Sequence, residues 1–278
     1  MFKKGVSVYI GLSQYNHFKN LEYIRNAKQL GYEIVFTSAH ISEANFNIEE
    51  LQELIDEVCK LDMKLSLDIS KKVYDKITLP PNLYALRLDY GFNYDEIIKF
   101  SNEKKYKIEI NASTFSQETI LELIKKGLNS KQIRASFNYY PKLHTGHTIE
   151  FCQKTIEFYH HLGITVSGFI PSHCSFRAPM YEGLPTVENH RKINLNLAIE
   201  EFKACEIDEI LFSDAYASNE ELKLLSYHQK EEIMIEFEPY NGFKNFDFIS
   251  DIVKFTCYPL SKRYFFRICL IYILSYYR

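Results

Sequence analysis

Three successive segments of the chain read EIVFTS (33–38), IEELQELIDEVCKL (48–61) and KLSLDI (64–69). The first and third are short apolar runs, which are typical of buried strands. In the middle segment, apolar residues recur every three or four positions, which predicts an amphipathic helix. A spacer of helix length is too long for a hairpin, so we expect the two strands to be parallel.

The same strand–helix unit recurs along the chain. The eight predicted strands begin at Gly5, Glu33, Lys64, Tyr84, Tyr106, Ile133, Ile164 and Glu209. Eight units in about 225 residues match the size of an α/β protein of the (β/α)8 TIM-type barrel class, which is the fold we predict. A doubly wound open sheet is the alternative, but no G-x-G-x-x-G follows the first strand. Ser218 followed by Glu221 predicts the start of the last helix.

Composition excludes several functional classes. The 278 residues carry a formal net charge of −3, so nothing indicates nucleic-acid binding. The six cysteines contain no CxxC pair, which favours neither a disulfide framework nor a zinc site, and we expect no metal and no cofactor. The amino terminus has no apolar signal-peptide core, so we expect a cytoplasmic protein.

The pattern changes near the carboxyl end of the chain. We assign residues 1–228 to the barrel domain and 229–278 to the remnant of a truncated C-terminal β domain or an aberrant, frameshifted tail. The apolar run at 264–277 is shorter than the roughly 20 residues of a membrane helix and is interrupted by Arg267, so we expect no membrane span. An amphipathic anchor is the alternative interpretation of this segment.

Several predicted strands end in polar residues at alternate positions. These are Ser66 and Asp68, Arg87 and Asp89, Glu109 and Asn111, Ser136 and Asn138, and finally Asp214. Alternate residues of a barrel strand face inward, and chemistry occurs at the carboxyl ends of the strands. We interpret Arg87 and Glu109 as a buried ion pair, and the residues one step further along as site candidates.

A second candidate region follows the seventh predicted strand. Residues 177–191 read RAPMYEGLPTVENHR, with two arginines, one histidine and two glutamates. Its prolines and glycine exclude a continuous helix. A rigid charged loop after a strand favours ligand binding. The alternative is a solvated loop whose arginines pair with its own glutamates.

Four motifs lie in order on these predicted strand ends and loops. They are Leu88–Phe92, Ile110–Thr114, Asn138–Pro141 with Thr145-Gly146, and Tyr181–Thr186 ending in His190-Arg191. Together they resemble the bacterial 6-phospho-N-acetylmuramidase family. The resemblance implies a TIM-type barrel followed by a smaller cyclophilin-like β domain, which we do not find after Gly242. It also implies cytoplasmic hydrolysis of the β-1,4 bond of a phosphorylated amino-sugar disaccharide, 6-phospho-N-acetylmuramyl-N-acetylglucosamine, in cell-wall recycling.

Hydrolysis of a glycosidic bond usually requires two carboxyl groups. From their positions, we predict Asp89 and Asp214 as the catalytic pair, with Asp68 and Glu182 in reserve. One of the two must have a raised pKa, so we expect it to lie against an aromatic side chain such as Tyr90, Tyr139 or Tyr216.

The phosphate and the sugars require further groups. We predict that Arg177 binds the phosphate, because a guanidinium can donate to two of its oxygens, with His190 and Arg191 as second choices. A salt bridge of Arg191 with Glu188 or Glu182 is the alternative. Other candidates for substrate contacts are Asn111, Asn138 and Tyr139, although the two asparagines could instead cap loops.

Two other functions remain open at this stage. A sugar-phosphate aldolase or isomerase would need a Schiff-base lysine at a strand end, but Lys64 and Lys107 begin their strands. A non-catalytic or inactive truncated sugar-phosphate-binding barrel is the other alternative.

Overall fold

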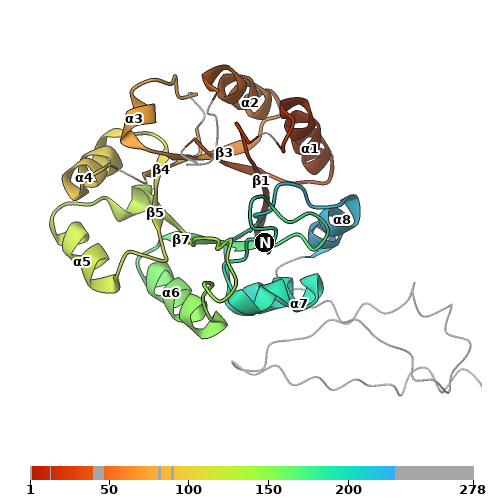
Figure 1. Cartoon of the computed structure of the whole chain (residues 1–278). Helices are drawn as coiled ribbons and strands as arrows, with labels where there is room; N and C mark the ends of the chain where they lie inside the picture. The colour runs from red at the N-terminus through yellow and green to blue at the C-terminus, as the bar shows by residue number, and fades with distance from the viewer. Residues whose placement is uncertain (1, 13, 40–46, 81–82, 89–90, 229–278) are drawn as a thin grey trace, which may run out of the picture. The chain divides into compact units, whose positions relative to one another are not determined.

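The computed structural model describes residues 2–12, 14–39, 47–80, 83–88 and 91–228 (Figure 1). The chain divides into two compact units, Met1–Tyr227 and His228–Arg278. The predicted remnant at 229–278 and the predicted catalytic residue Asp89 lie outside the described residues.

Eight parallel strands form a closed barrel in which each strand pairs with the next and β8 pairs with β1 (Figure 1). The strands are β1 (Lys3–Val8), β2 (Ile34–Ser38), β3 (Lys64–Ile69), β4 (Ala85–Leu88), β5 (Lys107–Asn111), β6 (Ile133–Ser136), β7 (Thr165–Ile170) and β8 (Glu209–Phe212). This closed ring confirms the predicted (β/α)8 TIM-type fold.

Helices surround the barrel (Figure 1). They are α1 (His17–Gln29), α2 (Ile48–Lys60), α3 (Lys71–Tyr74), α4 (Tyr94–Glu103), α5 (Gln117–Lys125), α6 (Ile149–His161), α7 (Leu195–Ala204) and α8 (Asn219–Tyr227), with 3-10 turns η1 (Ser130–Gln132) and η2 (Glu188–Arg191). The predicted capping pair is present before α8, where the Glu221 N–H donates to Ser218 Oγ and the Ser218 N–H to Glu221 Oε2. None of the helices described is long and apolar enough to cross a membrane.

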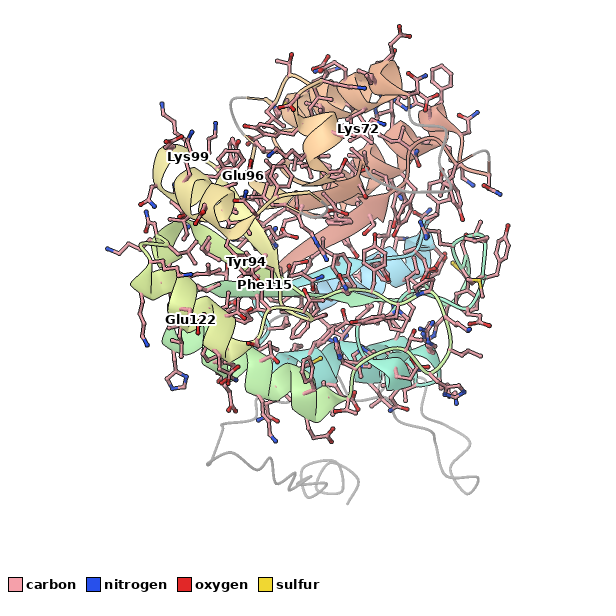
Figure 2. All side chains as sticks on the ribbon, turned by 60° about the vertical axis from the view of Figure 1, so that its left-hand side comes forward. Lys72, Tyr94, Glu96, Lys99, Phe115 and Glu122 are labelled. Atoms are coloured by element: carbon pink, nitrogen blue, oxygen red, sulfur yellow. The ribbon has the colours of Figure 1, made fainter. Side chains whose placement is uncertain are left out.

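Side chains at the start of α4 contact α3 and the segment just before α5. Tyr94, the first residue of α4, lies against Phe115 just before α5, with ring centroids 6.0 Å apart (Figure 2). Glu96 completes a capping box with Asn93 and pairs with Lys71 of α3 at 2.5 Å. These contacts fix the amino end of α4, and therefore the end of the loop that follows β4.

Alternation along the strands separates two apolar layers. One face of each strand packs against the helices in a large core, whereas Ile34, Phe36, Phe169 and Leu211 pack together inside the barrel. Gly5 of β1 is required here, because a Cβ at this position would lie 2.6 Å from Leu211 Cγ. The barrel is therefore filled with side chains at its middle, and ligands can reach only its ends.

A buried ion cluster lies inside the barrel, and it is not the one we predicted. Arg134 of β6 forms salt bridges with Glu109 of β5 and Glu209 of β8, and all three side chains are buried. The interpretation of Arg87 and Glu109 as an ion pair is therefore wrong. Glu109 lies in register between two arginines, and Arg134 binds it because Arg134 can reach a second carboxylate as well.

Candidate active site

Arg87 belongs to a polar network at the carboxyl ends of β4–β6. Its guanidinium donates to Ser136 Oγ at 3.1 Å and to Asn138 Oδ1. The amide of Asn111 also donates to Asn138 Oδ1, at 2.9 Å, and Asn111 Oδ1 accepts the N–H of Ser113. The two predicted substrate-binding asparagines are thus brought together, and the arginine beside them fixes their orientation.

Asp68 lies next to this network at the end of β3. Ser66, two residues earlier, donates to Glu109 inside the barrel, so Asp68 also faces inward. Asp68 is in register with Arg87 of β4 and is mostly buried. It lies close enough to the Tyr139 hydroxyl to raise the pKa of this phenol, although burial is the larger cause. Asp68 is therefore a carboxyl group on the inner rim of the barrel, beside a tyrosine.

Tyr139 connects the two sides of this rim. Its ring packs against Phe36 and Phe169 at the top of the interior apolar layer, with centroids 5.9 and 4.9 Å away. Arg177 and Arg87 act to lower the pKa of its hydroxyl, in opposition to burial and Asp68. The Tyr139 hydroxyl thus lies within electrostatic range of both arginines and of Asp68, which places these four groups around one region.

Arg177 is a buried cation that forms no salt bridge with any residue in the described part of the chain. Its guanidinium lies over the ring of Tyr9, 4.6 Å from the centroid, and the residue is 9% exposed. The side chain makes no hydrogen bond or ion pair with any other residue that the structure describes, and its Nε is fully buried. Burying an isolated charge is costly unless it is paired, so this guanidinium is suited to bind an anion.

Asp214 holds the loop that carries Arg177. Its Oδ1 accepts the backbone N–H of Arg177 at 2.7 Å, and its Oδ2 accepts those of Ser172 and Leu184 at 3.0 and 3.3 Å. The side chain is 0% exposed. Burial raises the pKa of Asp214 to about 7, in opposition to the three N–H groups and Arg177, which lower it.

The hydrogen bonds of Asp214 place its carboxyl group against the loop that follows β7. All three N–H groups that it accepts, those of Ser172, Arg177 and Leu184, belong to this loop, so the position of Asp214 is that of a support for the loop. Its predicted role as a reacting carboxyl stays a prediction, and the contacts observed are those of a loop anchor.

The other predicted site residues of this loop, Arg191, Glu182 and His190, form hydrogen bonds with neighbouring parts of the protein. Arg191 donates from Nε to Glu188 Oε1 and from both terminal nitrogens to four backbone carbonyl groups. Glu182 accepts the N–H of Leu143 at 2.7 Å. The His190 ring is buried against Glu201 at 3.0 Å, and burial lowers its pKa. None of these three side chains is brought to Arg177, and all three connect parts of the scaffold.

Sequence reasoning did not identify Tyr15 as part of this region. Its hydroxyl accepts the N–H of Ala178, the residue after Arg177, at 2.8 Å. Its ring packs edge-on against Tyr216 and lies 6.4 Å from Tyr9. The only available signal was an aromatic residue in the loop after the first strand, which does not indicate a role. No group of three His, Cys, Asp or Glu among the described residues could hold a metal ion.

Solved structures with similar folds include two proteins of unknown function. One, from Enterococcus faecalis, is 28% identical with a TM-score of 0.69, and the match covers 79% of this chain and 63% of that chain. The other, from B. cereus, is 27% identical with a TM-score of 0.70, covering 83% and 66%. The chain thus spans less than two thirds of the length of either relative.

A Bacillus subtilis spore coat polysaccharide biosynthesis protein is similar in fold alone, at 11% identity and a TM-score of 0.54, with coverage of 81% of this chain and 66% of that chain. No curated protein matches the sequence. A family model described as the N-terminal part of 6-phospho-N-acetylmuramidase matches residues 4–227, which is nearly the whole barrel. The chain belongs to the 6-phospho-N-acetylmuramidase family, and its barrel is the N-terminal domain of that family.

Proposed function

We propose that this protein is a cytoplasmic glycoside hydrolase that cleaves the β-1,4 bond of 6-phospho-N-acetylmuramyl-N-acetylglucosamine during peptidoglycan recycling. The observation that carries the proposal is Arg177, a buried guanidinium with no anionic partner among the described residues, at the carboxyl ends of the barrel strands. A sugar phosphate supplies the missing anion, and a guanidinium can donate to two of its oxygens at once. The family to which the chain belongs supports the choice of substrate.

The carboxyl groups assigned to bond cleavage are Asp68 and Asp89, at the ends of neighbouring strands. Asp68 faces the inner rim beside Arg87, and Asp89 follows β4, one residue beyond its last residue. One group protonates the leaving oxygen, while the other attacks the sugar or activates water. Asp214, whose pKa burial raises to about 7, is the alternative acid, and Glu182 is the remaining reserve.

Neutral groups of the rim are assigned to the sugar substituents. Asn111 and Asn138 are hydrogen-bonded to each other beside Arg87, and Tyr139 packs on Phe169. Their amide and hydroxyl groups are assigned to the N-acetyl and ring hydroxyl groups of the substrate. Arg87 holds Asn138 in place by its hydrogen bond, so the amide of Asn138 is oriented before the substrate binds.

The test is incubation of the purified chain with the phosphorylated and the unphosphorylated muramyl disaccharide. Release of N-acetylglucosamine only from the phosphorylated compound, with loss of release in Asp68→Asn, supports the proposal. Binding of the phosphorylated compound without turnover would instead support the non-catalytic sugar-phosphate-binding protein.

A further inference from the structure

Two exposed apolar side chains follow the arginine within one turn of the chain. Met180 and Tyr181 are 44% and 56% exposed, and they follow Arg177 by three and four residues. The N–H of Tyr181 donates to the carbonyl group of Arg177 at 3.1 Å, so the chain closes one turn between them. The loop thus carries a buried cation at its start and an uncovered aromatic ring at its end.

The backbone of Tyr181 is in an unfavourable conformation. Its φ is 56°, in the left-handed region, which costs a non-glycine residue about 1–2 kcal/mol. An exposed ring recovers little of this cost by packing within the protein. Gly183, two residues later, is also in the left-handed region with a φ of 78°, but glycine adopts this conformation without strain. The Tyr181 ring thus gains little from packing within the fold, and its exposed face is open to a bound molecule.

The base of this loop is held firmly. The carboxylate of Asp214 accepts the N–H groups of Arg177 and Leu184, which come before and after Tyr181 in the chain. The hydroxyl group of Tyr15 accepts the N–H of Ala178. Tyr15 is in turn packed against Tyr216, with ring centroids 5.6 Å apart. The backbone that carries Tyr181 is therefore held in place at both ends, which limits the entropy lost when a ligand binds.

We infer that Tyr181, with Met180 beside it, is a platform for the uncharged sugar ring that adjoins the phosphorylated one in the substrate. This inference rests on the proposed function, in which Arg177 binds the phosphate. The flat apolar face of an aminosugar packs on an aromatic ring, and the backbone of Tyr181 is one turn away from that of Arg177. The platform selects a disaccharide over a phosphorylated monosaccharide.

The test compares the Kd values of the phosphorylated disaccharide and of 6-phospho-N-acetylmuramic acid in calorimetric titrations of the full chain. Tyr181→Ala and Tyr181→Gly should weaken disaccharide binding by roughly three- to tenfold, as expected for loss of an aromatic contact, and leave monosaccharide binding unchanged. Tyr181→Phe should bind like the wild type. Tyr227→Ala is the matched control, because Tyr227 is 65% exposed at the far end of α8.

The glycine variant separates a binding role from a structural role. Glycine accepts a φ of 56° without strain, so Tyr181→Gly should unfold at the same temperature as the wild type or a higher one while its disaccharide affinity falls. Unchanged disaccharide affinity in Tyr181→Ala, or equal weakening for both ligands, would overturn the platform. Arg177→Met tests the proposed function separately, since it should weaken both ligands; if it weakens neither, the phosphate assignment fails as well.

Discussion

Replacement of Asp214 by asparagine distinguishes a loop anchor from a reacting carboxyl group. Asparagine has the same shape but only one acceptor oxygen, whereas the two oxygens of Asp214 accept three backbone N–H groups. If the side-chain oxygen of the asparagine keeps the hydrogen bonds from Ser172 and Leu184, the new amide NH2 group faces the backbone N–H of Arg177, and neither group has an acceptor. Two buried donors are then unsatisfied, at about 1–3 kcal/mol each, so the loss of stability should be roughly 2–6 kcal/mol.

The assay is urea unfolding together with calorimetric binding of inorganic phosphate. If Asp214 is an anchor, Asp214→Asn should lower the free energy of unfolding by this amount and weaken phosphate binding, because the backbone at Arg177 shifts. Asp56→Asn is the control, since Asp56 is on the outer helix α2 and accepts a hydrogen bond from Gln52 of the same helix. A loss below about 1 kcal/mol, with phosphate binding intact and turnover abolished, would refute the anchor and favour the predicted catalytic role.

Three further outcomes follow from the same structure. Burial raises the pKa of Asp214 from 3.8 to about 7. The stability that Asp214 contributes is therefore fully present below about pH 4 and is lost as the pH rises to 7. The difference in free energy of unfolding between wild type and Asp214→Asn, measured by urea titration, should shrink across this range. Arg134→Met removes the salt bridges of Glu109 and Glu209 inside the barrel and leaves Glu209 paired with Lys3 at 3.6 Å, so it should cost about 3–5 kcal/mol in the same assay. A neutral effect would show that the ion cluster does not stabilise the barrel. Gly5→Ala places a Cβ 2.6 Å from Leu211 and should lower stability by about 1–3 kcal/mol, whereas an unchanged melting temperature would contradict the close packing there.

The barrel could be predicted because its evidence is local and repeated. Each unit carries an apolar run, a helix at 3.6-residue spacing and a stop signal, and eight such units in one chain restrict the topology to few choices. The helix start at Ser218 was also predictable, since the pair with Glu221 lies within one turn. Such signals depend only on residues that are close in sequence, so they can be recognised without knowledge of the tertiary structure.

The contacts inside the barrel could not be predicted in the same way. Pairing strand neighbours in order suggested an Arg87–Glu109 ion pair, but Glu109 has an arginine on each side, and the choice of Arg134 depends on Glu209 across the barrel. The tertiary structure supplies this second carboxylate, which is 75 residues away in the chain.

The charged loop at 177–191 shows the same limit. Two interpretations were open, ligand binding and internal pairing, and the structure divides the two arginines between them. Arg191 pairs with Glu188 and donates to backbone carbonyl groups, whereas Arg177 has no such partner among the described residues. Both arginines lie in one motif, so their sequence neighbours could not separate them.

We propose above all that Arg177 binds the phosphate of a sugar substrate. The most direct test is calorimetric titration of two sugars, 6-phospho-N-acetylmuramic acid and N-acetylmuramic acid, into the wild type, Arg177→Met and Arg177→Lys. Arg25→Met is the control, since Arg25 lies on α1 and pairs with Glu57. We predict that the wild type prefers the phosphorylated sugar, that Arg177→Met loses this preference, and that Arg177→Lys retains part of it. An undiminished preference in a folded Arg177→Met protein would contradict the claim.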